Sequence, residues 1–157
     1  MKAVGVVEYG GPDALQVVEL PDPQVAPGQV RIRVHAAAVS PTDTFVRNGA
    51  RAEAQQVAGP PPYIPGMDVA GVLEQIGEGA ATPLRPGDHV MAIVLPRGSH
   101  GGYSEQVVVP VESVARTPDG VTDVEASTLP MNGLTAQLAL DVLCLEPGQT
   151  LAVTGAA

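Results

Sequence analysis

The chain of 157 residues contains one cysteine, one phenylalanine, three tyrosines and no tryptophan. The single cysteine, Cys144, excludes an internal disulfide and any metal site built from several thiolates. Since aromatic side chains are so scarce, Val, Leu, Ile and Ala must fill the core, and 45% of the residues are hydrophobic. We therefore predict an aliphatic core, and we expect Cys144 to be a small core residue near the end of an apolar helix.

Basic residues and long apolar runs are also scarce. The chain has 8 Lys and Arg against 17 Asp and Glu, which gives a formal net charge of −9. Binding to nucleic acid through its phosphates would require the opposite sign. No stretch approaches the roughly 18 apolar residues needed to cross a bilayer, and the opening apolar run is too short for a signal peptide. The sequence thus argues against nucleic-acid and membrane partners and predicts a soluble, cytoplasmic protein.

Short apolar runs separated by turn residues dominate the first 120 residues. The 18 glycines and 16 prolines fall between these runs, as turn residues do. Alternating or apolar patterns predict strands over 1–9, 14–20, 29–36, 69–76, 89–95 and 103–109. Many short strands about ten residues apart indicate a mainly β fold, either a barrel or a sandwich.

Two segments predict helices. Ser40 as the N-cap and Pro41 as the first helical residue predict a short helix ending near Gly49. The following residues, 50–62, lack periodicity and end in three prolines, which is typical of a loop. After residue 120 the pattern changes, because Thr122 or Asp123 can cap a second helix and residues 131–143 are apolar at helical spacing.

The last residues predict the start of a different kind of domain. Residues 150–154 form a short apolar run of the buried-strand type, followed by Gly155 and Ala156. A buried strand that runs into such residues is how a phosphate-binding βα turn begins. A lone strand cannot form a sheet, so we expect either that another chain completes it or that the sequence is a fragment.

A series of short motifs extends over the whole chain in a recognisable order. They are MKAV (1–4), GGP (10–12), VHAAAVSPTD (34–43), PGMDVAGV (65–72), GEG (77–79), PGDHV (86–90), GGYSE (101–105), NGLTA (132–136) and VTGAA (153–157). This series resembles the medium-chain dehydrogenase/reductase superfamily, nearest its zinc-independent, zeta-crystallin-like quinone oxidoreductase branch. The resemblance implies a GroES-like, partly open β-barrel with short helices over 1–121. It also implies that 122–157 hold connecting helices and the first strand of an incomplete α/β Rossmann domain.

The resemblance also bears on metal chemistry. Zinc-dependent members of the superfamily hold a catalytic zinc with Cys, His and Cys, and the matching positions here resemble Ser40, Met67 and Met131. A serine hydroxyl is poorly ionised and thioethers are poor zinc donors. We therefore expect no metal. The reaction expected is hydride transfer from NADPH to a quinone or an activated C=C (enone), since hydrogen-bond donors can then stabilise the developing oxyanion.

Several residues are candidates for the site that the resemblance implies. Ser40 would donate a hydrogen bond to the substrate carbonyl, although it also suits a helix cap. Tyr63, as a catalytic or substrate-binding residue, and Phe45 would line the substrate cleft, although both are natural core residues in a chain so poor in aromatics. Candidate cofactor-binding residues are Asn132, Thr135, Gly155 and Ala156.

The remaining polar candidates favour structural roles. Asp43 and Asp68 suit buried carboxylates that orient turns more than they suit acid–base work. Of the three histidines, we expect His35 to be solvated and His89 to be structural, whereas His100 in a glycine-rich loop could contact substrate. Their spacing does not predict a metal site.

Two other functional classes stay open at this point. One is a non-catalytic GroES-like binding or assembly module that lacks its cofactor domain. The other is a co-chaperonin, in which the segments 40–43 and 132–136 would have no role. The leading hypothesis is an oxidoreductase that acts on a small molecule and forms a homodimer as a full-length protein, with this chain inactive alone.

Overall fold

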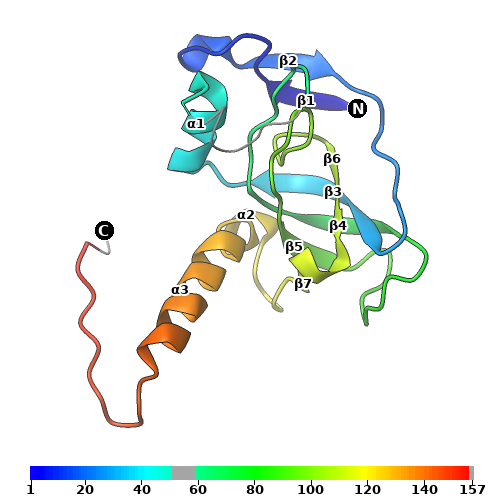
Figure 1. The fold of residues 1–157 in the computed structure, drawn as a ribbon. Coiled ribbons are helices and arrows are strands. Elements are labelled where there is room, and N and C mark those ends of the chain that lie inside the picture. Colours follow the sequence, from blue (N-terminus) through cyan, green and yellow to red (C-terminus); the bar gives the residue numbers. More distant parts are fainter. Residues whose placement is uncertain (51–58, 156–157) are drawn as a thin grey trace.

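The computed structural model describes residues 1–50 and 59–155, drawn in Figure 1. Its strands are β1 (Lys2–Gly5), β2 (Gln16–Glu19), β3 (Gln29–Ala37), β4 (Asp68–Ile76), β5 (His89–Ile93), β6 (Gln106–Pro110) and β7 (Val114–Arg116). Its α-helices are α1 (Pro41–Asn48), α2 (Asp123–Ala126) and α3 (Pro130–Leu143), with short 3₁₀ turns at η1 (Pro12–Ala14) and η2 (Val111–Ser113). The mainly β class predicted for the first 120 residues is confirmed.

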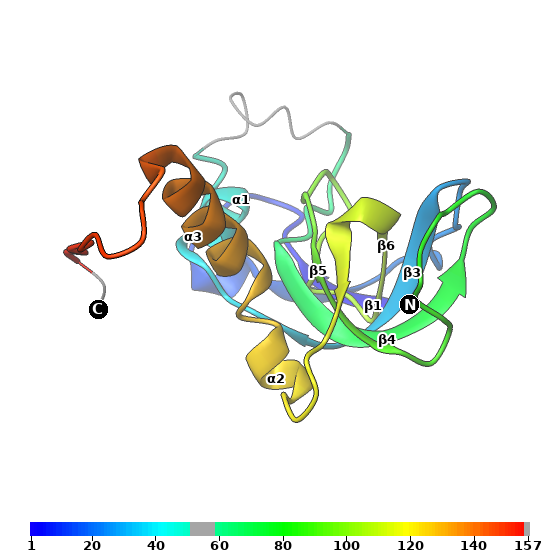
Figure 2. The same cartoon turned by 90° about the horizontal axis from the view of Figure 1, so that it is seen from below.

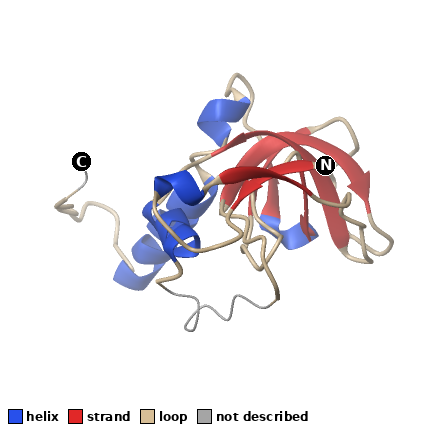
Figure 3. Ribbon diagram, turned by 90° about the horizontal axis from the view of Figure 1, so that it is seen from above, coloured by secondary structure: helices blue, strands red, loops and turns tan. Residues whose placement is uncertain are grey.

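A curved antiparallel sheet forms the body of the fold. Its strand order is β6-β3-β4-β5-β7, and β1 and β2 form a separate antiparallel pair. The strands gather on one side of the molecule and α1 and α3 on the other (Figures 2 and 3). The core is aliphatic, as predicted, and its buried members are Val30, Ile32, Val69, Leu73, Leu84, Val90, Ala92, Val94, Val107 and Val109.

The pairing of β3 with β4 is irregular. The pairing register shifts between Val34 and Ala36, next to Gly71 of β4. A Cβ added to Gly71 would lie 2.0 Å from the Arg33 carbonyl oxygen. Only a glycine therefore lets the two strands approach so closely at this irregularity.

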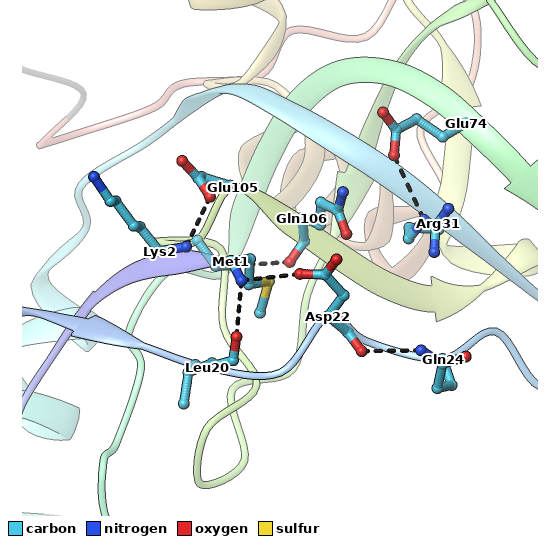
Figure 4. Close-up of polar contacts among 10 residues, drawn as sticks. Met1, Lys2, Leu20, Asp22, Gln24, Arg31, Glu74, Glu105 and Gln106 are labelled. Carbon is cyan, nitrogen blue, oxygen red and sulfur yellow. Dashed lines mark hydrogen bonds and ion pairs between the residues drawn. The ribbon is translucent and has the colours of Figure 1, made fainter.

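Polar contacts tie the β1–β2 pair to its surroundings (Figure 4). The Met1 ammonium group donates to the Leu20 carbonyl at 2.8 Å and to the Asp22 carboxylate at 2.9 Å. The Lys2 backbone N–H donates to the Glu105 carboxylate at 2.7 Å, which links β1 to the segment that precedes β6. These contacts join the N-terminus to the residues after β2 and to the segment before β6.

The predicted strand over 103–109 forms only from residue 106. Residues 103–105 pair with the N-terminal strand instead, since Val4 N–H donates to the Tyr103 carbonyl at 2.7 Å and Glu105 N–H to the Lys2 carbonyl at 3.0 Å. The predicted loop over 50–62 lies partly outside the described residues.

The C-terminal segment departs from the sequence predictions in two ways. Residues 150–154 form no strand, because no strand within 1–50 or 59–155 pairs with them and a strand needs a neighbour for its backbone hydrogen bonds. Cys144 is exposed and not a core residue: it ends α3 with a φ of 47°, and its thiol donates to the Asp141 carbonyl. The apolar residues of α3 are largely exposed too. Apolar residues at helical spacing therefore predicted the helix but not the burial of its apolar side chains. No described helix is both long and apolar enough to cross a membrane.

Candidate functional site

The N-terminus of α1 presents two neighbouring hydroxyl groups. Ser40 is the N-cap and Pro41 the first helical residue, as predicted, and Gly49 ends the helix with a φ of 73°. The Ser40 hydroxyl hydrogen-bonds the Thr42 hydroxyl at 2.5 Å. Ser40 is thus a helix cap whose hydroxyl is part of a short hydroxyl pair, and the sequence reasoning missed Thr42 although it lies only two residues away.

Asp43 ties this helix start to a distant loop. One carboxylate oxygen accepts the Gly66 N–H at 2.9 Å, and the other accepts the Ser40 N–H at 2.7 Å and the Tyr103 hydroxyl at 3.1 Å. The side chain is buried, with 4% relative exposure. Burial raises the pKa of Tyr103, and the Asp43 carboxylate raises it further, so the phenol stays a donor. Asp43 therefore orients the loop, the structural role predicted from the sequence.

Asp68 makes the matching tie to α3. Its carboxylate accepts the Met131 N–H, at the start of the helix, at 2.6 Å. Burial raises the pKa of Asp68 and the nearby Asp43 charge adds to the rise, while the Met131 N–H opposes it. Two buried carboxylates therefore lie near each other and join α1, the loop before β4, and α3.

These ties bring together segments that are far apart in the sequence. The Ser40 N–H donates to Asp43 and the Met131 N–H donates to Asp68. Met67 lies between Gly66, whose N–H donates to Asp43, and Asp68 itself. Figures 1 and 2 both show α1 and α3 on the same side of the barrel. The three positions singled out from the sequence thus belong to connected segments on one side of the fold.

A cavity of about 170 Å³ opens beside this junction. Thr42 and Val46 of α1 form one wall, and Met67 lies at its side. The opposite lining comes from the segment after β5, and its residues are Leu95, Pro96 and Arg97. The cavity combines apolar walls with one hydroxyl and one guanidinium, which suits a small, mostly apolar ligand with a few polar groups.

The two aromatic candidates take different places. Tyr63 stacks on Tyr9 with ring centroids 4.9 Å apart and an interplanar angle of 11°. Its backbone N–H donates to the Val6 carbonyl at 2.8 Å, and its side chain is not among those that line the Thr42–Met67 cavity. Phe45 lies half-buried on α1. A substrate contact by either residue stays a prediction.

The candidate cofactor residues lie on α3 and beyond it. Asn132 is exposed, and its side-chain amide donates to the Thr128 carbonyl at 2.9 Å. Thr135, one turn after Met131, is exposed and stands on the same helix face. Gly155 has a φ of 71°, as a turn requires, and Ala156 lies outside the described residues. Among the described residues, no strand pairs with residues 150–155, and the cofactor-binding role of these candidates stays a prediction.

His35 and His89 share one carboxylate that sequence reasoning missed. The Nδ1 atoms of His35 and His89 lie 2.7 Å and 2.9 Å from the two oxygens of Asp123. Burial acts to raise the pKa of Asp123, but the two histidine hydrogen bonds outweigh it and lower that pKa below its ordinary value. His35 is therefore not simply solvated: it helps to hold α2 on the sheet. Nothing in the sequence spacing of three such distant residues indicated this contact.

His100 lies on the same loop as Arg97, but it lines a different hollow, together with Met1 and Asp22. Burial lowers the pKa of His100, and the Arg97 charge lowers it further. The ring is therefore neutral near pH 7. Among residues 1–50 and 59–155, no group of three or more His, Cys, Asp or Glu side chains has a geometry that could hold a metal ion.

Comparisons with known proteins agree with this architecture. Residues 26–119 match the model of the alcohol dehydrogenase GroES-like domain. Human quinone oxidoreductase is 32% identical over 160 residues, which cover 99% of this chain and 46% of that protein. The human synaptic vesicle membrane protein VAT-1 homolog-like is 32% identical over 159 residues, covering 99% of this chain and 35% of the relative.

Solved structures of related proteins are similar to this chain as well. The quinone oxidoreductase from Coxiella burnetii superposes with a TM-score of 0.80 at 30% identity, covering 94% of this chain and 46% of that one. A mycobacterial relative solved in complex with NADPH gives a TM-score of 0.76 at 32% identity, covering 94% of this chain and 43% of that one. This chain spans less than half the length of these relatives.

The fold and the family match define the class of the protein. The chain belongs to the alcohol dehydrogenase GroES-like domain family, the N-terminal domain of the medium-chain dehydrogenase/reductase superfamily. The relatives named above place it beside the quinone oxidoreductases and VAT-1 proteins of that superfamily.

Proposed function

We propose that this chain is the substrate-binding part of a zinc-independent oxidoreductase that transfers hydride from NADPH to a quinone or an enone. The observation that carries the proposal is the junction made by Asp43 and Asp68. It gathers the segments of Ser40, Met67 and Met131, which match metal-ligand positions of zinc-dependent relatives but offer one hydroxyl and two thioethers. Such a donor set is unsuited to zinc.

The residues of this chain then have to bind and polarise the acceptor. NADPH, when bound, supplies the hydride. As hydride adds to the β-carbon of an enone, the electron pair of the C=C bond moves toward the carbonyl oxygen, which becomes an enolate. In this proposal the Thr42 hydroxyl donates to the Ser40 oxygen over 2.5 Å, which leaves the Ser40 proton to donate to that carbonyl oxygen. Solvent or the same hydroxyl pair then provides the proton that completes the reduction.

The cofactor-binding roles of Asn132, Thr135, Gly155 and Ala156 belong to the same proposal. Both Asn132 and Thr135 are exposed on α3, next to the junction that Met131 enters. Tyr63 and Phe45 are likewise proposed to line the site of the acceptor. The full-length protein is proposed to form a homodimer. Residues beyond those described here have to complete the nucleotide-binding sheet, since residues 150–154 pair with no described strand.

The test is NADPH oxidation by the full gene product that contains this chain. We expect turnover with at least one member of a panel of quinones and enones, unchanged by a chelator and by added zinc. The Ser40→Ala variant should lose about a hundredfold in kcat/KM, as expected for one oxyanion donor. A Ser113→Ala variant in η2 serves as the matched control and should keep full activity.

Two results would contradict the proposal. Activity lost on chelation and restored by zinc would show that the metal position is used despite its ligands. No turnover with any acceptor, together with retained binding of a small molecule or a protein, would instead favour the non-catalytic binding module.

A further inference from the structure

The Thr42–Met67 cavity is lined by a positively charged side chain, Arg97, that has no ion-pair partner among residues 1–50 and 59–155. Within residues 1–50 and 59–155, Arg31 and Arg33 pair with Glu74, and Arg116 pairs with Asp88. Arg97, which lines the cavity, forms no ion pair with any residue of those ranges. In a chain with a net charge of −9, a cation left without an acidic partner beside a cavity is available for an anionic ligand.

The loop holds Arg97 in a defined place. Its N–H donates to the His100 carbonyl at 2.8 Å, and the His100 N–H donates back to the Arg97 carbonyl at 3.1 Å. Gly98 turns the chain with a φ of 58°, and its carbonyl accepts the Ile64 N–H at 2.9 Å. The backbone of this turn is therefore anchored to the segment before β4, and the exposed Arg97 side chain extends from it.

His100 on the same turn adds no second charge. Its pKa is lowered by burial and then by Arg97, so the ring does not compete for an anion at neutral pH. Arg97 is thus the one cation among the six residues that line this cavity, which are Thr42, Val46, Met67, Leu95, Pro96 and Arg97.

We propose that Arg97 selects acceptors that carry a carboxylate. The inference rests on the proposed function and narrows its substrate class to anionic enones or quinones. In this arrangement Val46, Met67 and Leu95 contact the unsaturated body of the acceptor. Thr42, whose hydroxyl pairs with that of Ser40, lies at the carbonyl end, and the guanidinium binds the carboxylate in a bidentate manner. Without such a group, the negative charge of the protein would disfavour an anionic acceptor over its neutral analogue.

The test compares β-acetylacrylate, an enone with a carboxylate, with its neutral methyl ester. In the full gene product we expect a lower KM for the acid, with the difference shrinking as salt is raised. Arg97→Gln should raise the KM for the acid about tenfold and leave the ester and kcat unchanged, while Arg97→Lys restores part of the loss. Arg85→Gln, an exposed arginine that also lacks an ion pair within the described ranges, is the matched control and should change neither KM.

A binding measurement separates this inference from the proposed function. In the absence of cofactor, β-acetylacrylate should shift the amide resonances of Arg97 and Gly98 saturably in NMR spectra of the same protein, and the shifts should disappear in Arg97→Gln. If no acceptor is reduced but this binding is seen, the proposed activity is wrong and the carboxylate site stands. If the acid and the ester bind and react alike in both proteins, the carboxylate site is wrong and the proposed activity stands.

Discussion

Replacing Asp43 by alanine tests whether one buried carboxylate holds the candidate site together. The side chain is 4% exposed and accepts hydrogen bonds from Ser40 N–H, Gly66 N–H and the Tyr103 hydroxyl. Hydrogen bonds to a charged group contribute about 1.5–3 kcal/mol each, and the three are not additive because they share one carboxylate. Alanine also leaves the Ser40 and Gly66 N–H groups without their carboxylate acceptor.

From these contacts we expect Asp43→Ala to lower the free energy of unfolding by about 3–5 kcal/mol. Asp43→Asn keeps one acceptor oxygen and should lose about 2 kcal/mol. Urea unfolding monitored by circular dichroism measures both changes, with an unchanged m-value showing that the native and denatured states are otherwise comparable. Tyrosine fluorescence gives a second probe, since the sequence has no tryptophan.

The matched control is Asp13→Ala, which removes an exposed carboxylate in η1 and should change stability by less than about 0.5 kcal/mol. A loss below about 1 kcal/mol for Asp43→Ala would refute the reasoning. It would mean that water or a local rearrangement satisfies Ser40 and Gly66 equally well, and that the loop before β4 does not depend on this carboxylate.

Two further changes test other parts of the fold. Gly71→Ala places a methyl group 2.0 Å from the Arg33 carbonyl oxygen, so we expect a loss of at least about 2 kcal/mol in the same unfolding assay, and a variant of native stability would contradict the observed strand approach. Asp123→Asn weakens the contacts with His35 and His89, which are 36% and 60% exposed, so the loss should be only about 1 kcal/mol. Because the folded-state pKa of Asp123 is lowered from 3.8, its contribution is complete above that pH and is lost as the pH falls below it, so the two proteins should converge in acid. A difference that instead grew in acid would show that the sign is wrong.

Local sequence patterns predicted the short-range structure well. Helix α1 begins at Ser40 and Pro41 and ends at Gly49, as the capping preferences of these residues predict. Such caps are predictable because they depend only on backbone groups a few residues away. The alternation over 29–36 gave β3 and buried Val30 and Ile32, since the period of a strand places alternate side chains on one face. The order of the family motifs along the chain was enough to predict the superfamily, without any knowledge of tertiary contacts.

The same patterns failed where burial depends on distant neighbours. Residues 150–154 have the composition of a buried strand, yet no described strand pairs with them. Cys144 looked like a core residue from its apolar surroundings, yet it is exposed at the end of α3. Composition states which residues could be buried, but only the elements that pack against them decide whether they are.

The sequence by itself determined the donor chemistry of this protein: its single cysteine, its acidic charge, and a hydroxyl and two thioethers at Ser40, Met67 and Met131. Only the tertiary structure decided which side chains meet. It joined Asp43 to Gly66, Asp68 to Met131 and Asp123 to two histidines, and it put Arg97 beside Thr42 in one cavity. Residue types are written in the chain, whereas contacts between residues 20 to 90 positions apart arise from strand register and the path of loops, which no local pattern specifies.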